Sequence, residues 1–266
     1  LVDISSAYNY NLRVLKDELP IFSKQNWLLR YSKKILSAIK LGLLYPLNRF
    51  AKHKLKAVQE KFGGRLRLAI SGGGTLPDFL DNWIDAIGIR IVNAYGMTEC
   101  APAITGRALN CNTFSTLGTP IKGTELKIIG EDGSELPRGS VGEIIIKGEQ
   151  VTPGYYKNEE ENKKSFTKDG YFKSGDLGKV TLKNELVITG RSKEIIVLAS
   201  GENVDPSRIE SMISKLPFIT DTVLVGQDKK GLGMLVVPDF EELKEYIYKH
   251  FNKVVQNMEH VLEDKS

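Results

Sequence analysis

The fold of this chain is decided by residues 65–99, which read RLRLAISGGGTLPDFLDNWIDAIGIRIVNAYGMTE. Arg65–Ser71 predicts a buried strand, and three glycines, Gly72 to Gly74, follow it. Pro77–Ile87 predicts a helix with proline at its start, and Ile89–Asn93 predicts a second strand. Together these elements make a βαβ unit, whose crossover makes the two strands parallel. The loops after both strands therefore lie at the carboxyl edge of the sheet, where open α/β sheets bind ligands.

Towards the carboxyl terminus, the pattern changes to β and then back to α/β. Between about 113 and 190 the expected strands are Glu125–Ile129, Gly142–Lys147, Gly178–Leu182 and Glu185–Thr189. Short strands at such intervals predict a small barrel or sandwich. After Gly190 the expected elements are strands at Ile195–Leu198, Asp221–Val225 and Met234–Val237, and helices at Pro206–Ser214 and Phe240–Glu259. This last stretch predicts a separate small domain.

Towards the amino terminus, the sequence predicts a basic helical segment. Helical periodicity covers Trp27–Lys40 and Leu47–Phe62, and Pro46 is expected to break the two helices. Residues 30–67 carry eleven Lys or Arg against one acid, Glu60. Such a segment is either a solvated basic face or a peripheral contact with an anionic membrane. The predicted domains are 1–112, 113–190 and 191–266.

The composition sets the class of protein. The 266 residues are 41% apolar and 26% charged with a net charge of +4, which is typical of a soluble globular protein and does not favour nucleic acid as a partner. No apolar stretch approaches the length of a membrane span. Two cysteines, Cys100 and Cys111, favour a reducing compartment, and we expect a cytoplasmic protein. The three histidines lie too far apart in the sequence to predict a zinc site.

The residues Tyr95–Glu99 concentrate chemical groups in one predicted loop. An aromatic ring can stack on a purine, a hydroxyl can donate to a phosphate, and a carboxylate can hold Mg²⁺ among phosphate oxygens. The alternative is an ordinary loop in which Thr98 caps a helix. The three glycines allow close approach of a ligand or form a tight structural turn. Asp176 and Arg191, fifteen residues apart, either serve a ribose and a phosphate or are a turn residue and a solvated cation.

Six motifs occur in a particular order. They are Ser71-Gly-Gly-Gly74, Tyr95-Gly-Met-Thr-Glu99, Gly154-Tyr-Tyr-Lys157, Ser174-Gly-Asp176, Gly190-Arg-Ser-Lys193 and Gly201-Glu-Asn-Val-Asp-Pro206. In this order they resemble the adenylate-forming superfamily, and within it most of all the long-chain fatty acid–CoA ligases, over residues 65–240. The resemblance implies an α/β adenylate-forming fold. This fold has a βαβ sheet portion, a small β-barrel-like subdomain and a small mobile α+β carboxyl-terminal domain.

The resemblance also implies a nucleotide site. Gly73 and Gly74 would line the adenine pocket, and Tyr95 would stack on the adenine. Asp176 would hold the ribose, and Arg191 would bind near it.

The catalytic groups follow from the same resemblance. Thr98 would contact the α-phosphate, and Glu99 would hold Mg²⁺. Lys193 would be the hinge about which the small domain rotates, and Gly201 would lie beside the pantetheine tunnel of coenzyme A. From the residues themselves, Asp205 is expected to cap the helix that begins at Pro206.

Two features of the family are not recognised in this sequence. No phosphate loop precedes residue 65, and no counterpart of the catalytic lysine is found, since Lys265 stands in an unrelated Glu-Asp-Lys-Ser tail. We therefore expect a carboxyl-terminal portion of a longer enzyme, inactive alone.

Three interpretations of function remain open. The first is an ATP-dependent ligase that joins a fatty acid to coenzyme A, with Mg²⁺ as cofactor. The second is a module that binds an adenylate without turnover, and the third is a peptide-synthetase adenylation domain.

Overall fold

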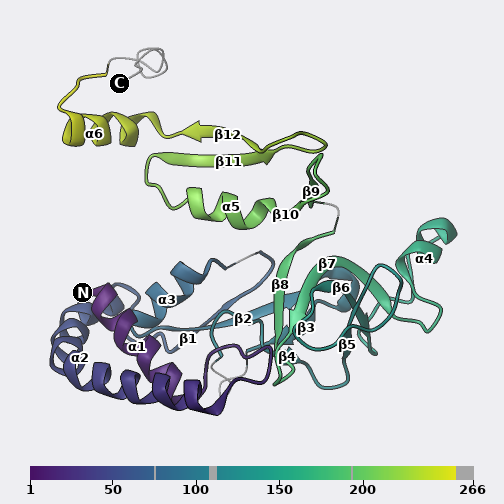
Figure 1. The fold of residues 1–266 in the computed structure, drawn as a ribbon, viewed down its shortest axis with the longest axis horizontal. Coiled ribbons are helices and arrows are strands. Elements are labelled where there is room, and N and C mark those ends of the chain that lie inside the picture. Colours follow the sequence, from purple (N-terminus) through teal and green to yellow (C-terminus); the bar gives the residue numbers. More distant parts are fainter. Residues whose placement is uncertain (75, 108–112, 193, 256–266) are drawn as a thin grey trace. The chain divides into compact units, whose positions relative to one another are not determined.

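The computed structural model describes residues 1–74, 76–107, 113–192 and 194–255, and it divides the chain into two compact units, Leu1–Thr189 and Gly190–Ser266 (Figure 1). Each unit is described by itself. Whether residues 113–190 form a domain of their own stays a prediction. No helix in the described part of the chain combines the length and apolar character that crossing a bilayer requires.

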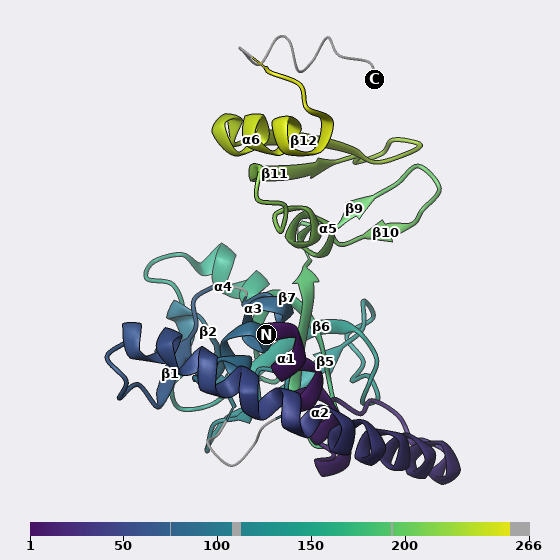
Figure 2. The ribbon, with the colours of Figure 1, turned by 90° about the vertical axis from the view of Figure 1, so that its left-hand side faces the viewer.

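Two helices at the amino terminus of the first unit pack against each other, as Figures 1 and 2 show. They are α1 (Val2–Lys16) and α2 (Trp27–Lys61), and α1 also contacts α3 (Asp78–Ala86). A buried polar pair links α1 and α2, since the Ser5 hydroxyl donates to Asn48 Oδ1 at 3.0 Å. The sequence patterns did not predict α1.

The expected break at Pro46 is wrong, because α2 runs for 35 residues with Pro46 inside it. A proline in a helix interior removes one hydrogen bond, but it does not prevent the turns on either side from forming their own. The helix begins at a cap on Asn26, whose side chain accepts from the amide of Leu28 at 3.0 Å.

The βαβ unit forms as predicted, except that its first strand is shorter than expected and is not buried, since Ile70 is 75% exposed. β1 (Leu68–Ser71) pairs in parallel with β2 (Arg90–Gly96), and α3 is the crossover that packs on β2. Two antiparallel strands, β3 (Ala103–Gly106) and β4 (Thr119–Pro120), extend the sheet in the order β1-β2-β3-β4. β2 continues further than predicted, so that Tyr95 and Gly96 are strand residues rather than loop residues.

The predicted barrel is wrong. In the described residues, β5 (Glu125–Ile129), β6 (Gly142–Lys147), β7 (Phe172–Val180) and β8 (Leu186–Arg191) form an open sheet in chain order, with α4 (Glu159–Ser165) between β6 and β7. The sheet does not close because β8 bonds elsewhere. The Leu117 amide donates to the Leu186 carbonyl, and the Leu186 amide donates to the Gly118 carbonyl, each at 2.8 Å.

One hydrophobic core joins the two sheets of the first unit. Its buried members come from both sheets and from the turn after β2: Tyr95, Cys100, Ile104, Ile128, Ile144, Ile146 and Leu186. The core therefore fixes the end of β2 against β6.

The second unit is small and contains both helices and strands. It contains β9 (Ile196–Val197), β10 (Asn203–Val204), α5 (Pro206–Ile213), β11 (Ile219–Val225), β12 (Gly233–Pro238) and α6 (Phe240–Phe251). As predicted, Asp205 caps α5, with its carboxylate accepting from the Ser207 amide at 3.1 Å. The expected helix to Glu259 is too long, because Asn252 adopts a left-handed conformation and ends α6. Residues 256–259 lie outside the described residues.

Candidate functional site

The first two motifs lie at the same edge of the sheet. Ser71 is the register partner of Asn93, so the Gly72–Gly74 loop leaves β1 beside the second half of β2, which continues to Gly96. A Cβ on Gly72 would lie 3.6 Å from the carbonyl oxygen of Ala94. Gly73 and Gly74 are both exposed, and Gly73 has a φ of +82° that favours glycine.

Tyr95 and Asp176 meet directly although they are 81 residues apart. The Tyr95 hydroxyl donates to Asp176 Oδ2 at 2.5 Å. Only 8% of Tyr95 is exposed, since the ring belongs to the shared core. Burial, and then the hydrogen bond to Asp176, raise the pKa of Tyr95 above its ordinary value. The ring that was expected to stack on adenine therefore leaves only a small part of its surface accessible.

A bulge in β7 presents Asp176 to Tyr95. The register partners change from Ile145 and Lys173 to Glu143 and Leu177, so two steps along β6 correspond to four along β7. The extra residues fall in the Ser174-Gly-Asp176 motif, where Gly175 has a φ of +73°. The Ser174 hydroxyl donates to the Ile144 carbonyl at 2.8 Å and accepts from the Asp176 amide at 3.1 Å. Bulges commonly redirect a side chain beside an active site, and this one redirects Asp176.

The turn after β2 is tight. A Cβ on Gly96 would lie 1.9 Å from the carbonyl oxygen of Pro102, which also accepts from the Met97 amide at 2.8 Å. Only glycine fits there. The turn leads into a short 3₁₀ helix, Thr98–Cys100, whose cap residue is Met97 without a side-chain cap. Thr98 is thus not a helix cap, and its side chain is exposed.

Glu99 is half-buried and tied to the segment before α4. Its Oε1 accepts from the Tyr155 hydroxyl at 2.9 Å, and burial followed by this bond raises the pKa of Tyr155 to about 12. The neighbouring Cys100 thiol is buried, and burial together with Glu99 raises its pKa to about 11, so it stays protonated at neutral pH and serves as packing. Cys111 lies outside the described residues.

This part of the structure offers a divalent cation one carboxylate, that of Glu99, rather than a complete set of protein ligands. Within the described residues there is no group of three acidic, histidine or cysteine side chains that could hold a metal alone. Mg²⁺ is usually held by one or two carboxylates together with substrate phosphates. Glu99 fits that pattern at the end of β2.

One buried acceptor at this edge was missed by the sequence patterns. Asn93 is 9% exposed, and its Oδ1 has no hydrogen-bond partner among the described residues. It stands two positions before Tyr95 on β2, opposite Ser71. An unpaired buried amide oxygen is costly, and the signal in the sequence was a polar residue inside an otherwise apolar strand.

The remaining predicted residues belong to the second unit or lie outside the description. Arg191 is exposed and forms an ion pair with Glu194 at 3.4 Å. Gly201 forms the tight turn between β9 and β10, where its amide donates to the Leu198 carbonyl at 2.8 Å. Lys193 lies outside the described residues. Arg191 and Gly201 belong to the second unit, whereas Tyr95, Glu99 and Asp176 belong to the first.

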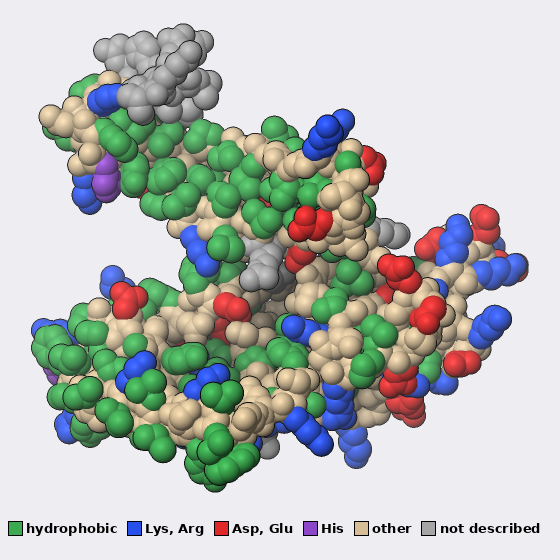
Figure 3. Space-filling model, in the orientation of Figure 1, with side chains coloured by type: hydrophobic (Ala, Val, Ile, Leu, Met, Phe, Trp, Pro, Cys, Tyr) green, Lys and Arg blue, Asp and Glu red, His purple; other side chains and the backbone are tan. Residues whose placement is uncertain are grey.

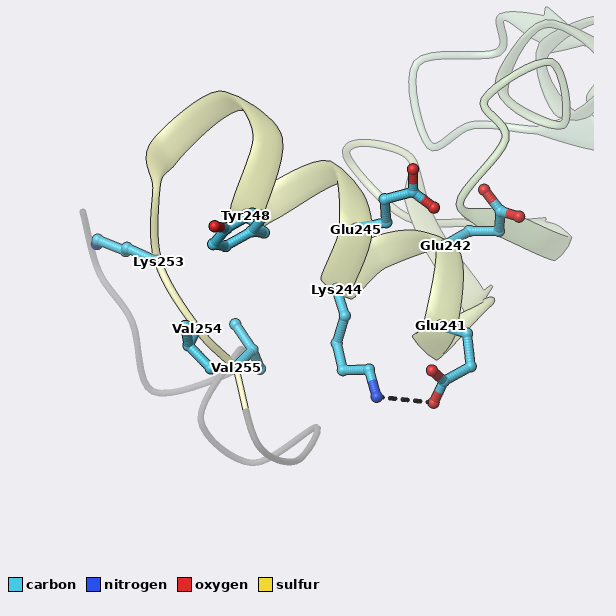
Figure 4. A pocket seen from close by; sticks show the side chains of 8 residues that line it. All are labelled: Glu241, Glu242, Lys244, Glu245, Tyr248, Lys253, Val254 and Val255. Atoms are coloured by element: carbon cyan, nitrogen blue, oxygen red, sulfur yellow. Dashed lines mark ion pairs between the residues drawn. The ribbon is translucent and has the colours of Figure 1, made fainter.

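A pocket in the second unit is separate from all of these motifs. It has a volume of about 470 Å³ and is lined by α6 and residues 253–255. Figure 4 shows the ion pair between Lys244 and Glu241 at its rim, 2.9 Å long, with Glu242 and Glu245 on the same helix. Three carboxylates make it a poor site for a nucleotide phosphate.

Comparison with known proteins identifies the family. Residues 36–156 match the family model described as AMP-binding enzyme, and residues 193–266 match the AMP-binding enzyme C-terminal domain. A chloroplastic long-chain-fatty-acid–[acyl-carrier-protein] ligase of Arabidopsis thaliana is 38% identical over 76% of this chain and 29% of its own length. A long-chain-fatty-acid–CoA ligase of Mycobacterium bovis is 36% identical over 73% of this chain and 30% of its own. The chain spans about 30% of the length of each of these two relatives.

Comparison with solved structures leads to the same family. The ATP-bound crystal structure of MatB from Rhodopseudomonas palustris matches 76% of this chain and 43% of that chain, with a TM-score of 0.60 and 28% identity. The family matches and the fold together show that this chain belongs to the AMP-binding, adenylate-forming enzymes.

Proposed function

We propose that the protein activates a fatty acid in two steps. In the first, the fatty acid carboxylate attacks the α-phosphorus of ATP, giving an acyl-adenylate and pyrophosphate. In the second, a thiol attacks the acyl carbonyl, giving a thioester and AMP. The proposal draws support from relatives named as long-chain fatty acid ligases. This chain would carry the half of the site that binds adenosine and the α-phosphate.

The single observation that carries the proposal is the contact between Tyr95 and Asp176. It joins two motifs 81 residues apart at the carboxyl edge of a parallel strand pair. This is the edge at which α/β sheets bind ligands. A carboxylate can accept several hydrogen bonds, so Asp176 would accept from ribose hydroxyls as well as from Tyr95.

The other residues take roles around this contact. Gly73, Gly74 and Tyr95 would form walls of the adenine pocket. Thr98, which is exposed at the start of the 3₁₀ helix, would donate to the α-phosphate.

In the second unit, Arg191 would bind near the ribose, Lys193 would act as hinge and Gly201 would lie beside the pantetheine arm of coenzyme A. Glu99 would hold Mg²⁺, which would stabilise negative charge on the phosphate oxygens.

The acyl acceptor is proposed to be coenzyme A. The relative from Mycobacterium bovis is named for CoA, whereas the one from Arabidopsis is named for acyl-carrier protein. Coenzyme A and acyl-carrier protein both present a pantetheine thiol. Assays of thioester formation with each acceptor would show which one the enzyme uses.

Calorimetry with AMP tests the nucleotide site. We expect Asp176→Ala to weaken AMP binding by at least about tenfold, because hydrogen bonds to a charged group contribute roughly 1.5–3 kcal/mol each and ~1.4 kcal/mol is a factor of ten. Asp169→Ala is the matched control, since Asp169 is an exposed residue in the turn before β7. Unchanged AMP affinity in Asp176→Ala would show that the ribose role is wrong.

A pyrophosphate-release assay with a fatty acid and ATP tests turnover. We expect this chain alone not to release pyrophosphate at an enzymic rate, because neither the phosphate loop nor the catalytic lysine is recognised in its sequence. AMP binding without any turnover, even in a longer form of the protein, would favour the non-catalytic adenylate-binding module. Turnover with an amino acid instead of a fatty acid would favour a peptide-synthetase adenylation domain.

The location and the membrane contact are also proposals. A cytoplasmic enzyme would have access to ATP and coenzyme A, and cell fractionation tests this location. A contact of residues 30–67 with the membrane surface would bring the site close to fatty acids.

A further inference from the structure

The segment between β6 and α4 is bound to the Glu99 turn at two points. The Tyr155 hydroxyl donates to Glu99 Oε1 at 2.9 Å. The Thr152 amide donates to the Glu99 backbone carbonyl at 2.7 Å. Within the described residues, Tyr155 is the only side chain that hydrogen-bonds to the Glu99 carboxylate.

Asn162 of α4 fixes the backbone of Tyr155 in turn. Its Oδ1 accepts from the Tyr155 amide at 2.6 Å, and its Nδ2 donates to the Tyr155 carbonyl at 2.9 Å. The Asn162 side chain lies so close to the backbone before Tyr155 that a Cβ on Gly154 would lie 2.9 Å from Asn162 Oδ1. Gly154 also has a φ of +140°. Glycine is therefore required before Tyr155. The result is a continuous chain of contacts from Asn162 through Tyr155 to Glu99.

A glutamate side chain has three rotatable bonds, and an unrestrained carboxylate loses that freedom when it binds a cation. A hydrogen bond from Tyr155 to one oxygen fixes the orientation of the carboxylate before any ligand arrives. Second-sphere hydrogen bonds of this kind commonly orient carboxylates that bind metals.

We propose that Tyr155 is a positioning residue for the Glu99 carboxylate, and that Asn162 acts on Glu99 through Tyr155. The inference rests on the proposed function, in which Glu99 holds a divalent cation beside the phosphates of the nucleotide. Tyr155 itself does not touch the nucleotide in this proposal.

Calorimetry with ATP, in the presence and absence of Mg²⁺, tests the inference on the whole chain. Tyr155→Phe keeps the ring and removes the hydroxyl. We expect it to reduce the Mg²⁺-dependent gain in ATP affinity by up to about tenfold, as expected for loss of one hydrogen bond to a charged group. Affinity without Mg²⁺ should stay unchanged. Tyr156→Phe is the matched control, because Tyr156 is the next residue and is 88% exposed.

Asn162→Ala provides the second test. If Asn162 acts through Tyr155, it should reduce the same Mg²⁺-dependent gain, and the double variant Tyr155→Phe/Asn162→Ala should be no weaker than the more affected single variant. Fully additive effects would overturn the role of Asn162. Thermal unfolding of each variant shows whether it is folded, and a folded Tyr155→Phe chain that loses affinity equally with and without Mg²⁺ would show a merely structural role.

The outcomes distinguish this inference from the proposed function. If Mg²⁺ strengthens ATP binding to the wild-type chain and equally to Tyr155→Phe, only the positioning role of Tyr155 is overturned. If the wild-type chain binds neither ATP nor AMP, the nucleotide site itself is contradicted, and the positioning role is overturned with it.

Discussion

At the scale of single residues, the candidate site shares Tyr95 and Cys100 with the hydrophobic core of the first unit. Tyr95 is both a core residue and the donor to Asp176, so a change there should alter stability and, under the proposed function, nucleotide binding as well. Glu99 and Cys100 are neighbours with opposite roles, since one presents a carboxylate and the other packs as a neutral thiol.

The raised pKa of Tyr95 predicts an alkaline loss of stability. An unfolded tyrosine has a pKa of about 10. Because the folded pKa lies above the unfolded one, the stabilising contribution is complete below about pH 10 and is lost as the pH rises further. Tyr95→Phe removes a hydrogen bond to a charged group, which should lower the free energy of unfolding by about 1–3 kcal/mol at pH 8. The difference from wild type should shrink above pH 10.

Urea unfolding at a series of pH values, followed by tryptophan fluorescence, measures this difference. Both tryptophans, Trp27 and Trp83, belong to the first unit. Tyr156→Phe should match wild type at every pH because Tyr156 is exposed. A difference between wild type and Tyr95→Phe that stays constant from pH 8 to pH 11 would contradict the raised pKa.

At the scale of elements, α2 is unusual in its length and in its exposed surface. It continues through Pro46, and it leaves many large apolar side chains exposed, among them Ile35, Leu43 and Phe50. Figure 3 shows hydrophobic and basic side chains mixed over this part of the first unit. The basic residues of α2 thus stand among apolar ones.

Pro46→Ala should stabilise the first unit. Pro46 is exposed, so little packing is lost, and alanine restores the missing backbone donor. Proline costs up to about 3 kcal/mol more than alanine in a helix interior, and we expect a gain of about 1–3 kcal/mol in the free energy of unfolding. Lys40→Ala, at another exposed position of α2, should change it by less than about 0.5 kcal/mol. Destabilisation by Pro46→Ala would show that the proline is needed for the shape of the helix.

The segment 30–67 should bind anionic lipid. Each cation near the surface contributes about 1 kcal/mol, and the exposed apolar side chains of α2 can enter the headgroup region. Sedimentation with vesicles should show binding that requires phosphatidylserine and weakens with salt. Replacement of Lys33, Lys40, Lys54 and Lys56 by glutamate should abolish it. Equal binding to neutral vesicles would reject the preference for anionic lipid, and no binding to either kind of vesicle would reject the membrane contact itself.

At the scale of the whole molecule, the chain divides between Thr189 and Gly190. Each unit has a core of its own, with Ile196, Leu198 and Leu224 in the second. The division falls within β8, directly before the Gly190-Arg-Ser-Lys193 motif.

Limited proteolysis should cut the folded chain between about 190 and 203. Connections between compact units open more easily than their interiors, and the Arg191 side chain is 67% exposed to trypsin. Mass spectrometry should find two fragments that meet near Arg191 and resist further digestion. Arg191→Gln should slow this cut without changing cuts elsewhere. A digest that spares residues 190–203 would indicate that the two units behave as one.

The family and several of the local elements could be predicted from the sequence. The βαβ unit was predictable because a glycine turn, a proline at a helix start and apolar strands are all encoded within 35 consecutive residues. β5 and β6 begin and end where their patterns predicted. By contrast, α1 was missed although Ile4, Tyr8, Leu12 and Leu15 recur at a helical spacing, and its most buried residues are the polar Ser5, Asn11 and Arg13.

The assembly of the candidate site depends on contacts between segments that are far apart in the sequence. The motifs named Tyr95, Glu99 and Asp176, but no local pattern encodes a contact across 81 or 56 residues. Those contacts depend on the shared core that holds β2 against β6 and on the bulge that turns Asp176. The open sheet could not be predicted from the sequence either. The backbone of β8 can bond to β5 or to residues 117–118, and the outcome depends on a competition between distant segments. Local sequence sets what each segment can form, whereas the pairing of distant segments sets which side chains meet.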